Sequence, residues 1–593
     1  MGIEIKKAIF EGFGTRLSDK GLYVSCSIKY LNKSGLYIYD PISHDIIYKI
    51  EFEDSFYIGD VVCLNISGID FDGLYYNYYR DEEIFVDPYA RLLSDSKKYG
   101  VFVKERNVRG FSKDTCPMIP ASDSVFYITH VKGQTALDKK VKKDKGTFKA
   151  LESKRLYFKE LGITSVILMP VYELIPEKNL NYRIKENEKL PNYWGFGQGY
   201  YFALKKEFLT EDSDSDFKNM IMAYHKVGLE IILIMNFNEY QSSTYIESVL
   251  NFYVLNYHVD GFRIIGNINL DSILDNPFLS NTKLLIENAD YVKSIGRRNR
   301  NKNVYFVDSD FMNEARSFAK SDEDKVPYLS YAVRSNSQFY TPVRFISDFY
   351  GFSLWDTVSY NQKHNESNLE ANTDGTEYNH SWNCGVEGET GKTSVLKLRN
   401  RQSRNMYLIS MLCQGVPMLK AGDEWLNTQY GNNNPYCQDN DTSYVKFKNS
   451  KMNKDFYDFT KNLLAFRKRH VVLHQQRELR MFDYMSCGLP DVSFHGVETF
   501  KMDMTPVSRS FGVLYAGPYS KQYTKKEEQS IFIIFNMFWE DKEFELPFGE
   551  KGEWKLVYST DGSTDQSFDE TKAVSVQERK YLAKSRSVSV LVL

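Results

Sequence analysis

The stretch EIILIMNF, residues 230–237, is an almost uninterrupted apolar run that leads into the polar residues Asn238 and Glu239. A run without polar alternation predicts a strand covered on both faces, as in a parallel sheet flanked by helices. Further strings of this type lie between residue 125 and about residue 480. They are SVILMPV (165–171), GFRII (261–265), KLLIE (283–287), NVYFVD (303–308), VRFIS (343–347) and VPMLKAG (416–422).

Helix-like segments separate several of these strings, among them DFKNMIMAYHKVG (216–228) and SRNMYLISMLCQ (403–414). Repeated alternation of strand and helix over residues 125–485 favours an α/β fold, an elaborated (β/α)8 TIM barrel. A doubly wound sheet is the alternative, although no glycine-rich phosphate loop follows any of the early strands.

Short strand-like segments flank the predicted barrel on both sides. Residues 1–115 carry such segments about every ten residues, which is typical of a β-sandwich. Residues 490–593 predict a second β-sandwich, in which the alternation of SVSVLVL (587–593) indicates a half-buried antiparallel strand. The segment GFSKDTCPMIPASDS (110–124) is interpreted as a linker.

Charge and cysteine content exclude several classes of function. The net charge of −3 leaves no basic surplus for a nucleic-acid partner. The seven cysteines are scattered singly without CxxC pairs, which disfavours a disulfide framework or a zinc site. The first residues, 1–14, lack the apolar run of a signal peptide, and no apolar stretch is long enough to span a membrane. We therefore expect a soluble cytoplasmic protein without membrane, cofactor or metal.

The chemistry of a (β/α)8 barrel lies where the strands end at their C-terminal side. Acids such as Glu239 and Glu287 stand at such ends here, but spacing alone pairs none of them. The segment NYWGFGQGYYFAL (192–204) adds aromatic residues, including Trp194 and Phe196. Flat aromatic faces suit the apolar faces of sugar rings, although ordinary loop packing uses them as well. The residues alone thus predict a barrel protein that binds a polar ligand, and they do not specify a substrate.

Longer strings follow one another along the chain in a fixed order. They are VDPYA (86–90), HVKGQT (130–135), LGITSVILMPVYE (161–173), NYWGFGQ (192–198), SYNQKHNESNLEANTDGTEYNHSWNCGVEGET (359–390), GVPMLKAGDEWLNTQYGNNNPYCQDND (415–441) and VETFKMDMTPVSRSFGVLYAG (497–517). Together they resemble isoamylase-type glycogen debranching enzymes of the α-amylase superfamily, glycoside hydrolase family 13. The resemblance covers essentially the whole chain and implies that residues 1–115 are a carbohydrate-module-like domain.

The resemblance also implies a chemistry. Members of this family hydrolyse α-1,6 branch linkages in glycogen or starch-like glucans with retention of configuration. One Asp attacks the anomeric carbon, a Glu protonates the leaving oxygen, and a second Asp stabilises the charged transition state. The two principal carboxyl groups of a retaining enzyme lie about 5–5.5 Å apart.

Carried over position by position, the resemblance places the three acids as follows. Residues 259–263 match the family string V-D-G-F-R-x-D, and Ile265 stands at the position of the nucleophile. Glu287 stands at the position of the general acid. The family's His-Asp pair before Gly-Phe reads Phe349 and Tyr350 here, so Tyr350 replaces the transition-state Asp.

Other sugar-contacting positions are retained or changed. Arg263 and Trp194 are kept, whereas the Asp and His of the first conserved strand read Ile234 and Glu239. Phe196 corresponds to the tyrosine that stacks on the scissile sugar, and it keeps the flat face while losing the hydroxyl. The resemblance thus implies a substrate-binding set of Arg263, Trp194, Phe196, Glu239 and Phe349.

Loss of the nucleophile alone costs several orders of magnitude in rate. The first hypothesis is therefore a non-catalytic isoamylase-like protein that binds α-glucan or assembles with an active debranching enzyme as a regulatory subunit. The alternative is an active α-1,6 hydrolase or transferase with relocated acids, because Asp348 lies two residues before Tyr350 and can share its face. A third hypothesis is that the chain is a scaffold that has lost glucan binding and serves another partner. Arg263, without its usual partner, is predicted to pair with Asp260 or Glu287.

Overall fold

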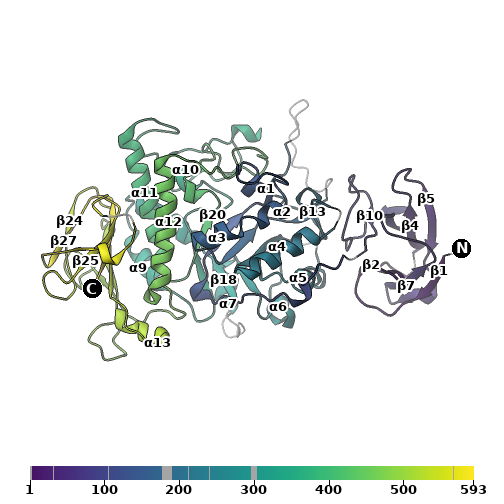
Figure 1. Ribbon diagram of the computed structural model, residues 1–593, viewed down its shortest axis with the longest axis horizontal. Helices are drawn as coiled ribbons and strands as arrows, with labels where there is room; N and C mark the ends of the chain where they lie inside the picture. The colour runs from purple at the N-terminus through teal and green to yellow at the C-terminus, as the bar shows by residue number, and fades with distance from the viewer. Residues whose placement is uncertain are drawn as a thin grey trace.

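The computed structural model describes residues 3–30, 32–104, 106–175, 190–211, 213–238, 241–266, 268–295, 303–564 and 567–593. The described chain forms a closed barrel between two groups of antiparallel sheets, with the N-terminal group at one end of the long axis and the C-terminal group at the other (Figure 1). The predicted fold class is confirmed. The exact boundaries 1–115, 125–485 and 490–593 remain a prediction about how the chain divides.

The barrel is built from parallel strands in chain order. They are β11 (Phe126–Thr129), β12 (Ser165–Leu168), β15 (Glu230–Asn236), β16 (Gly261–Ile265), β17 (Lys283–Ile286), β18 (Val304–Val307), β19 (Thr341–Arg344) and β20 (Val416–Lys420). The barrel closes where β20 pairs with β11. Almost every strand residue is buried, because one face fills the barrel and the other meets helices. Among the described barrel strands, β11 matches none of the predicted apolar strings, and β19 shares only Val343 and Arg344 with the string VRFIS.

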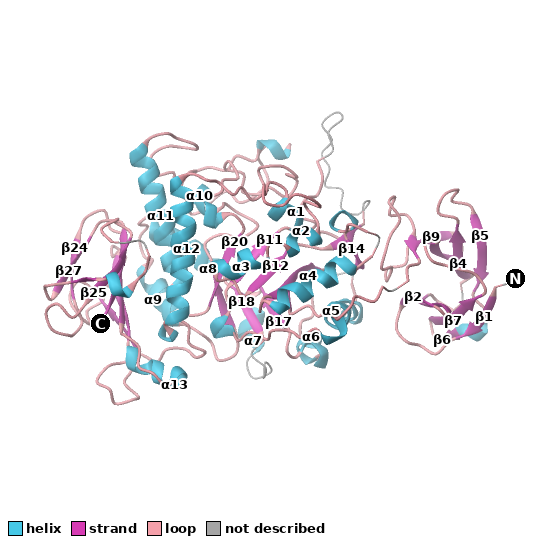
Figure 2. Ribbon diagram, viewed as in Figure 1, coloured by secondary structure: helices cyan, strands magenta, loops and turns pink. Residues whose placement is uncertain are grey.

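Helices cover the outside of the barrel (Figure 2). They are α2 (Phe148–Glu152), α3 (Arg155–Leu161), α4 (Ser215–Lys226), α5 (Ser243–Tyr257), α7 (Ala289–Ile295), α8 (Ser309–Ala319), α9 (Val326–Arg334), α11 (Thr393–Met411) and α12 (Lys451–Arg469). Side-chain caps fix several of their starts, as where Ser242 accepts a hydrogen bond from the Tyr245 amide at the start of α5. No helix in the described part of the chain is long and apolar enough to cross a membrane.

Shorter elements lie between the barrel strands and helices. The helices are α1 (Val131–Thr135), α6 (Asp271–Asp275) and α10 (Leu354–Thr357), and a separate antiparallel pair is β13 (Tyr172–Leu174) with β14 (Gly199–Leu204). A further short helix, α13 (Lys521–Thr524), belongs to the C-terminal part of the chain. The predicted helix over 216–228 is α4, and the one over 403–414 is the second half of the longer α11.

The N-terminal strands form two antiparallel sheets. One contains β1 (Glu4–Lys7), β7 (Val61–Ser67), β3 (Gly21–Ser27), β2 (Gly14–Ser18) and β6 (Tyr57–Ile58), and the other contains β10 (Gly100–Val101), β8 (Tyr75–Arg80), β4 (Ser34–Tyr39), β5 (Ile46–Glu51) and β9 (Glu83–Phe85). Their inner faces share one apolar core, in which Leu22 and Leu64 of the first sheet meet Leu36 and Ile38 of the second. This shared core makes the pair a β-sandwich.

The C-terminal strands form a larger and a smaller sheet. The larger follows the order β21 (Val492–His495), β22 (Ser510–Tyr515), β23 (Ile531–Asn536), β28 (Ser587–Val592), β25 (Lys555–Ser559) and β26 (Val574–Ser575), and the smaller pairs β24 (Lys542–Glu545) with β27 (Lys580–Ala583). The prediction that β28 is half-buried is wrong, since all its residues are buried. It lies between β23 and β25, with Val590 in the core shared with the barrel and Leu591 in the core around Trp554.

Candidate functional site

Arg263 stands inside the barrel on β16, and its side chain is fully buried. Its Nη1 and Nη2 donate hydrogen bonds to the two oxygens of Asp348 at 2.9 and 2.6 Å. Its Nε and Nη2 donate to Oε1 of Glu287 at 3.0 and 2.7 Å. Burial by itself would lower the pKa of Arg263, but the carboxylates of Asp348 and Glu287 raise it, so the guanidinium stays charged. The two acids compensate this buried charge.

Strand register explains why Glu287 reaches Arg263. Arg263 pairs with Leu285 across β16 and β17, and Glu287 lies two residues further along. Because side chains alternate along a strand, a shift of two residues keeps the side chain on the same face. The predicted pairing with Glu287 is therefore found, whereas the structure adds Asp348 as a second partner.

The alternative pairing of Arg263 with Asp260 is wrong. Asp260 lies just before the start of β16, and its Oδ2 accepts a hydrogen bond from the Ile231 amide at 2.8 Å. The same oxygen lies 3.0 Å from Nε2 of His225. Arg263 lies three residues after Asp260, which is about 10 Å along a strand, so the two side chains belong to different ends of the strand.

Ile265 closes β16 as a half-buried residue, and it packs against the apolar cluster that fills the barrel. Phe196, Phe349 and Tyr350 pack against the same cluster. The side chain at the predicted nucleophile position is thus surrounded by apolar groups. Glu239, which the sequence assigned to the same rim, lies outside the described residues.

The predicted rim aromatics pack against one another. The ring of Phe349 stacks on Phe196 with centroids 5.0 Å apart, and it meets Trp194 edge to face at 5.3 Å. Tyr350 meets Phe349 edge to face at 5.0 Å, and the Arg263 guanidinium lies 4.9 Å from the centre of the Phe349 ring. Such pairs contribute roughly 0.5–1.5 kcal/mol each beyond the area they bury. We call Trp194, Phe196, Phe349 and Tyr350 the rim cluster.

Tyr350 is held in place from two sides. Its hydroxyl lies 2.9 Å from Oγ of Ser309, within hydrogen-bond distance. The next amide in the chain, that of Gly351, donates to the carbonyl of Asn433 at 2.8 Å. Burial and the nearby charge of Asp348 raise the pKa of Tyr350 to about 12, so at neutral pH this position holds a neutral phenol.

The two strings that carry most of the resemblance interlock beside this point. Asn365 of the 359–390 string and Asn433 of the 415–441 string exchange hydrogen bonds at 2.9 Å in both directions. Asn432 donates to Asn368 at 2.9 Å in the same network. Because these amides are buried and satisfied, the two loops form one rigid support for the strand end that carries Tyr350.

Glu287 and Asp348 differ in accessibility. Both approach Nη2 of Arg263 to within 2.7 Å, so their nearest oxygens lie less than twice that distance apart. This upper limit is compatible with the separation of about 5–5.5 Å between the carboxyl groups of a retaining pair. The guanidinium, however, contacts both carboxylates, and the Asp348 side chain is 0% exposed against 33% for Glu287.

The sequence interpretation missed the role of Asp348 and Ser309. Asp348 was considered only as a relocated acid, directly after the string VRFIS. No sequence signal pairs it with Arg263, which lies 85 residues away on a strand that does not adjoin β19. Ser309 carries no such signal, since a serine at the start of a helix is common.

A parallel barrel with an arginine, two carboxylates and an aromatic rim at its strand ends, between two β-sandwiches, has the architecture of α-amylase-type glycoside hydrolases. Solved structures agree in fold: the catalytic module of the glycogen-degrading pneumococcal virulence factor SpuA, in complex with an inhibitor, has a TM-score of 0.74 at 16% identity and covers 98% of both chains. A pullulanase from Bacillus acidopullulyticus has a TM-score of 0.72 at 16% identity, over 99% of this chain and 75% of that one.

Sequence relatives narrow the class to a family. A glycogen operon protein GlgX homolog of Haemophilus influenzae is 31% identical over 487 aligned positions, and the match covers 65% of this chain and 73% of the relative. A glycogen debranching enzyme of an Enterobacter species is 30% identical over 473 aligned positions, and the match covers 66% of this chain and 69% of the relative. None of the protein-family models compared with the chain matches it. The chain belongs to the isoamylase-type glycogen-debranching family of the α-amylase superfamily.

Proposed function

We propose that this chain is a non-catalytic member of the family that acts in α-glucan metabolism, as a glucan-binding protein or as the regulatory subunit of an active debranching enzyme. One observation carries the proposal: the buried guanidinium of Arg263 is neutralised by Glu287 and Asp348, while Ile265 occupies the position of the nucleophile.

The chemistry of a retaining glycosidase explains why we expect this arrangement to lack hydrolytic activity. The nucleophile must offer a lone pair to the anomeric carbon, and an isoleucine side chain has none. The transition state carries positive charge, which a carboxylate stabilises and the neutral phenol of Tyr350 does not. Glu287 remains, but one of its oxygens already accepts two N–H groups from Arg263.

Assignment of α-glucan as the ligand rests on the family and on the rim cluster. The relatives carry names that refer to glycogen, and the solved SpuA module is described as glycogen-degrading. Trp194 and Phe196 stay at the barrel mouth, where flat rings suit sugar faces. Phe349 stacks on one face of Phe196, so a glucan would bind at the outer surface of the cluster.

An active enzyme with relocated acids is the second candidate, and the spacing of Glu287 and Asp348 is the observation that favours it. It requires Asp348 to leave Arg263 and enter solvent. Release of a buried, doubly hydrogen-bonded carboxylate leaves the buried guanidinium undercompensated, which costs about 3–5 kcal/mol.

Prolonged hydrolysis assays separate the two candidates. Purified protein is incubated with glycogen, amylopectin and pullulan, and reducing ends are followed for many hours beside a Glu287→Gln variant. We expect the two curves to coincide. Release above the Glu287→Gln curve that an Asp348→Asn change abolishes would establish the active enzyme instead.

Affinity electrophoresis in glycogen-containing gels tests the binding half of the proposal. We expect retardation of the chain, and weaker retardation of a Trp194→Ala variant, with migration in glycogen-free gels as the control. Absence of retardation would remove the glucan-binding role. Co-purification of the chain with an active debranching enzyme from the source cell would then be the remaining support for a regulatory subunit.

A further inference from the structure

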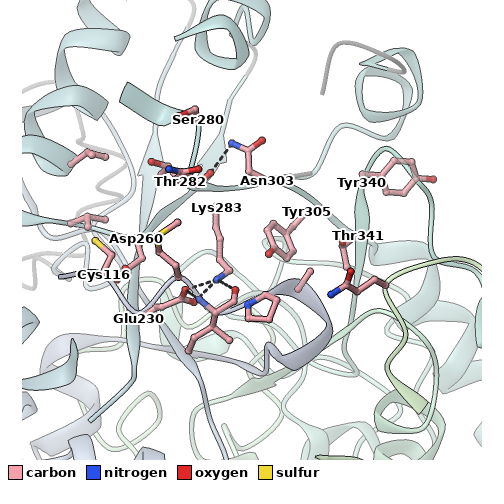
Figure 3. A pocket seen from close by; sticks show the side chains of 18 of the residues that line it. Cys116, Glu230, Asp260, Ser280, Thr282, Lys283, Asn303, Tyr305, Tyr340 and Thr341 are labelled. Carbon is pink, nitrogen blue, oxygen red and sulfur yellow. Dashed lines mark hydrogen bonds and ion pairs between the residues drawn. The ribbon is translucent and has the colours of Figure 1, made fainter. Parts of the chain in front are cut away.

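The end of the barrel opposite to Arg263 contains a cavity of about 440 Å³ (Figure 3). The residues that begin three neighbouring strands line it, namely Glu230, Asp260 and Lys283. Cys116, from the segment that connects the N-terminal sandwich to the barrel, lies at its edge beside Asp260 (Figure 3). Nothing in the proposed function uses this end of the molecule.

Three side chains of different chemistry converge here. The Sγ of Cys116, an imidazole nitrogen of His225 and a carboxylate oxygen of Asp260 all lie within 4.8 Å of one another. The closest pair, His225 Nε2 and Asp260 Oδ2, is 3.0 Å apart. Ligands held about 2.0–2.3 Å from a tetrahedral metal ion are separated by roughly 3.3–3.8 Å. Small shifts of these side chains therefore reach a coordination geometry.

The buried carboxylate of Asp260 is a second, independent observation that points to a ligand. Its side chain is 3% exposed, and its Oδ1 has no hydrogen-bond partner among the described residues. A buried carboxylate oxygen without a partner is costly, and native structures rarely contain one. The neighbouring Glu230 is already satisfied, because Lys283 contacts both its oxygens at 2.5 Å and the Ile119 amide donates to it.

The second coordination layer is also present. Nδ1 of His225 lies 2.7 Å from Oδ2 of Asp114, which also lies 3.1 Å from Nδ1 of His258. The imidazole donates from Nδ1 to Asp114 and, in the absence of a metal, from Nε2 to Asp260, so a metal ion at Nε2 would replace that proton while Asp114 still orients the ring. Metal-bound histidines commonly have such a carboxylate behind them.

We propose that Cys116, His225 and Asp260 bind a divalent transition-metal cation of the zinc class beside the cavity that Cys116 and Asp260 line. A mixed set of thiolate, imidazole and carboxylate suits Zn²⁺ and its spectroscopic substitute Co²⁺ and disfavours Mg²⁺ and Ca²⁺. Binding converts the Cys116 thiol to a metal-bound thiolate and releases its proton to the buffer. The cation ties the 110–124 segment to the base of the barrel.

The test is a titration of the tag-free full chain with Co²⁺ after treatment with EDTA and desalting. We expect one equivalent to bind with a near-ultraviolet thiolate-to-cobalt charge-transfer band, which Zn²⁺ then removes. Cys116→Ser should abolish the band and weaken binding at least tenfold. Cys487→Ser is the matched control, because Cys487 is the other exposed cysteine of the described chain, and it should leave the band intact.

A thermal readout keeps the proposal falsifiable without spectroscopy. A ligand that binds only the folded state raises the unfolding temperature, so Zn²⁺ should raise that of the wild type and of Cys487→Ser and leave that of Cys116→Ser unchanged. The proposal is overturned if the wild type takes up no Co²⁺, or if Cys116→Ser keeps the band. Cys116 is exposed, so its serine variant should fold normally.

Discussion

At the scale of single residues, Arg263 decides the properties of the site. A buried guanidinium must be compensated, and here Asp348 accepts two of its hydrogen bonds and Glu287 the others. Ile265, which the resemblance places at the nucleophile position, offers no third acid. The Arg263 side chain is fully buried and belongs to the interior of the barrel.

Substitution of Asp348→Asn should be strongly destabilising. It removes the fully buried partner of a buried cation, so the free energy of unfolding should fall by about 3–5 kcal/mol, measured by urea denaturation. Glu287→Gln serves as the comparison, because Glu287 is 33% exposed and its loss leaves Asp348 in place. If Asp348→Asn were as stable as the wild type, the ion pair would have no structural role.

Restoration of both missing acids should not restore hydrolysis. In the double variant Ile265→Asp with Tyr350→Asp, Asp348 still contacts Arg263 and Phe349 still stacks on Phe196. We expect the release of reducing ends from glycogen to stay at the level of the Glu287→Gln variant. Measurable hydrolysis by the double variant would contradict this expectation and would mean that the rim cluster moves aside when substrate binds.

At the scale of elements, the apolar runs predicted most of the barrel because a strand covered on both faces has a simple sequence signature. β11 (Phe126–Thr129) was not predicted, and its length does not explain this, because β12 and β17 are equally short. The pairing of Arg263 with Asp348 was also beyond the sequence, since it joins strand ends 85 residues apart. The metal-site residues failed to stand out for the same reason: Cys116, His225 and Asp260 meet only through the fold.

The two faces of β28 should be equally sensitive to truncation. Val590 and Leu591 point to opposite faces, and both are fully buried. Val590→Ala and Leu591→Ala should each lower the free energy of unfolding by about 2 kcal/mol or more, measured by denaturation. A half-buried strand, as its alternating sequence suggested, would respond on one face only, and that outcome would contradict the position of β28 in the sheet.

At the scale of the whole molecule, the pH dependence of stability reports on buried acids between the barrel and its helices. Burial raises the pKa of Glu424 to about 7, and Tyr157 and Tyr127 donate hydrogen bonds to it. The folded chain then binds more protons than the unfolded chain between about pH 4.5 and 7. The stability from this group is full below the unfolded pKa and is lost as the pH rises through the folded pKa.

A Glu424→Gln variant tests this linkage. Over pH 5 to 8 the wild type should lose free energy of unfolding on the order of 3 kcal/mol from Glu424 alone. The variant removes the titrating group, so its urea midpoint should fall less steeply with pH, whatever its absolute stability. Parallel slopes for wild type and variant would show that Glu424 ionises normally in the folded chain.

The charge balance around Arg263 has a consequence for the design of the barrel. Active sites usually hold their polar groups in unfavourable arrangements that only a substrate relieves, so activity is obtained at the expense of stability. Here Asp348 and Glu287 satisfy the guanidinium without any ligand. On the proposed non-catalytic function, stability at this site is not traded against turnover, because residues of the chain itself compensate the guanidinium.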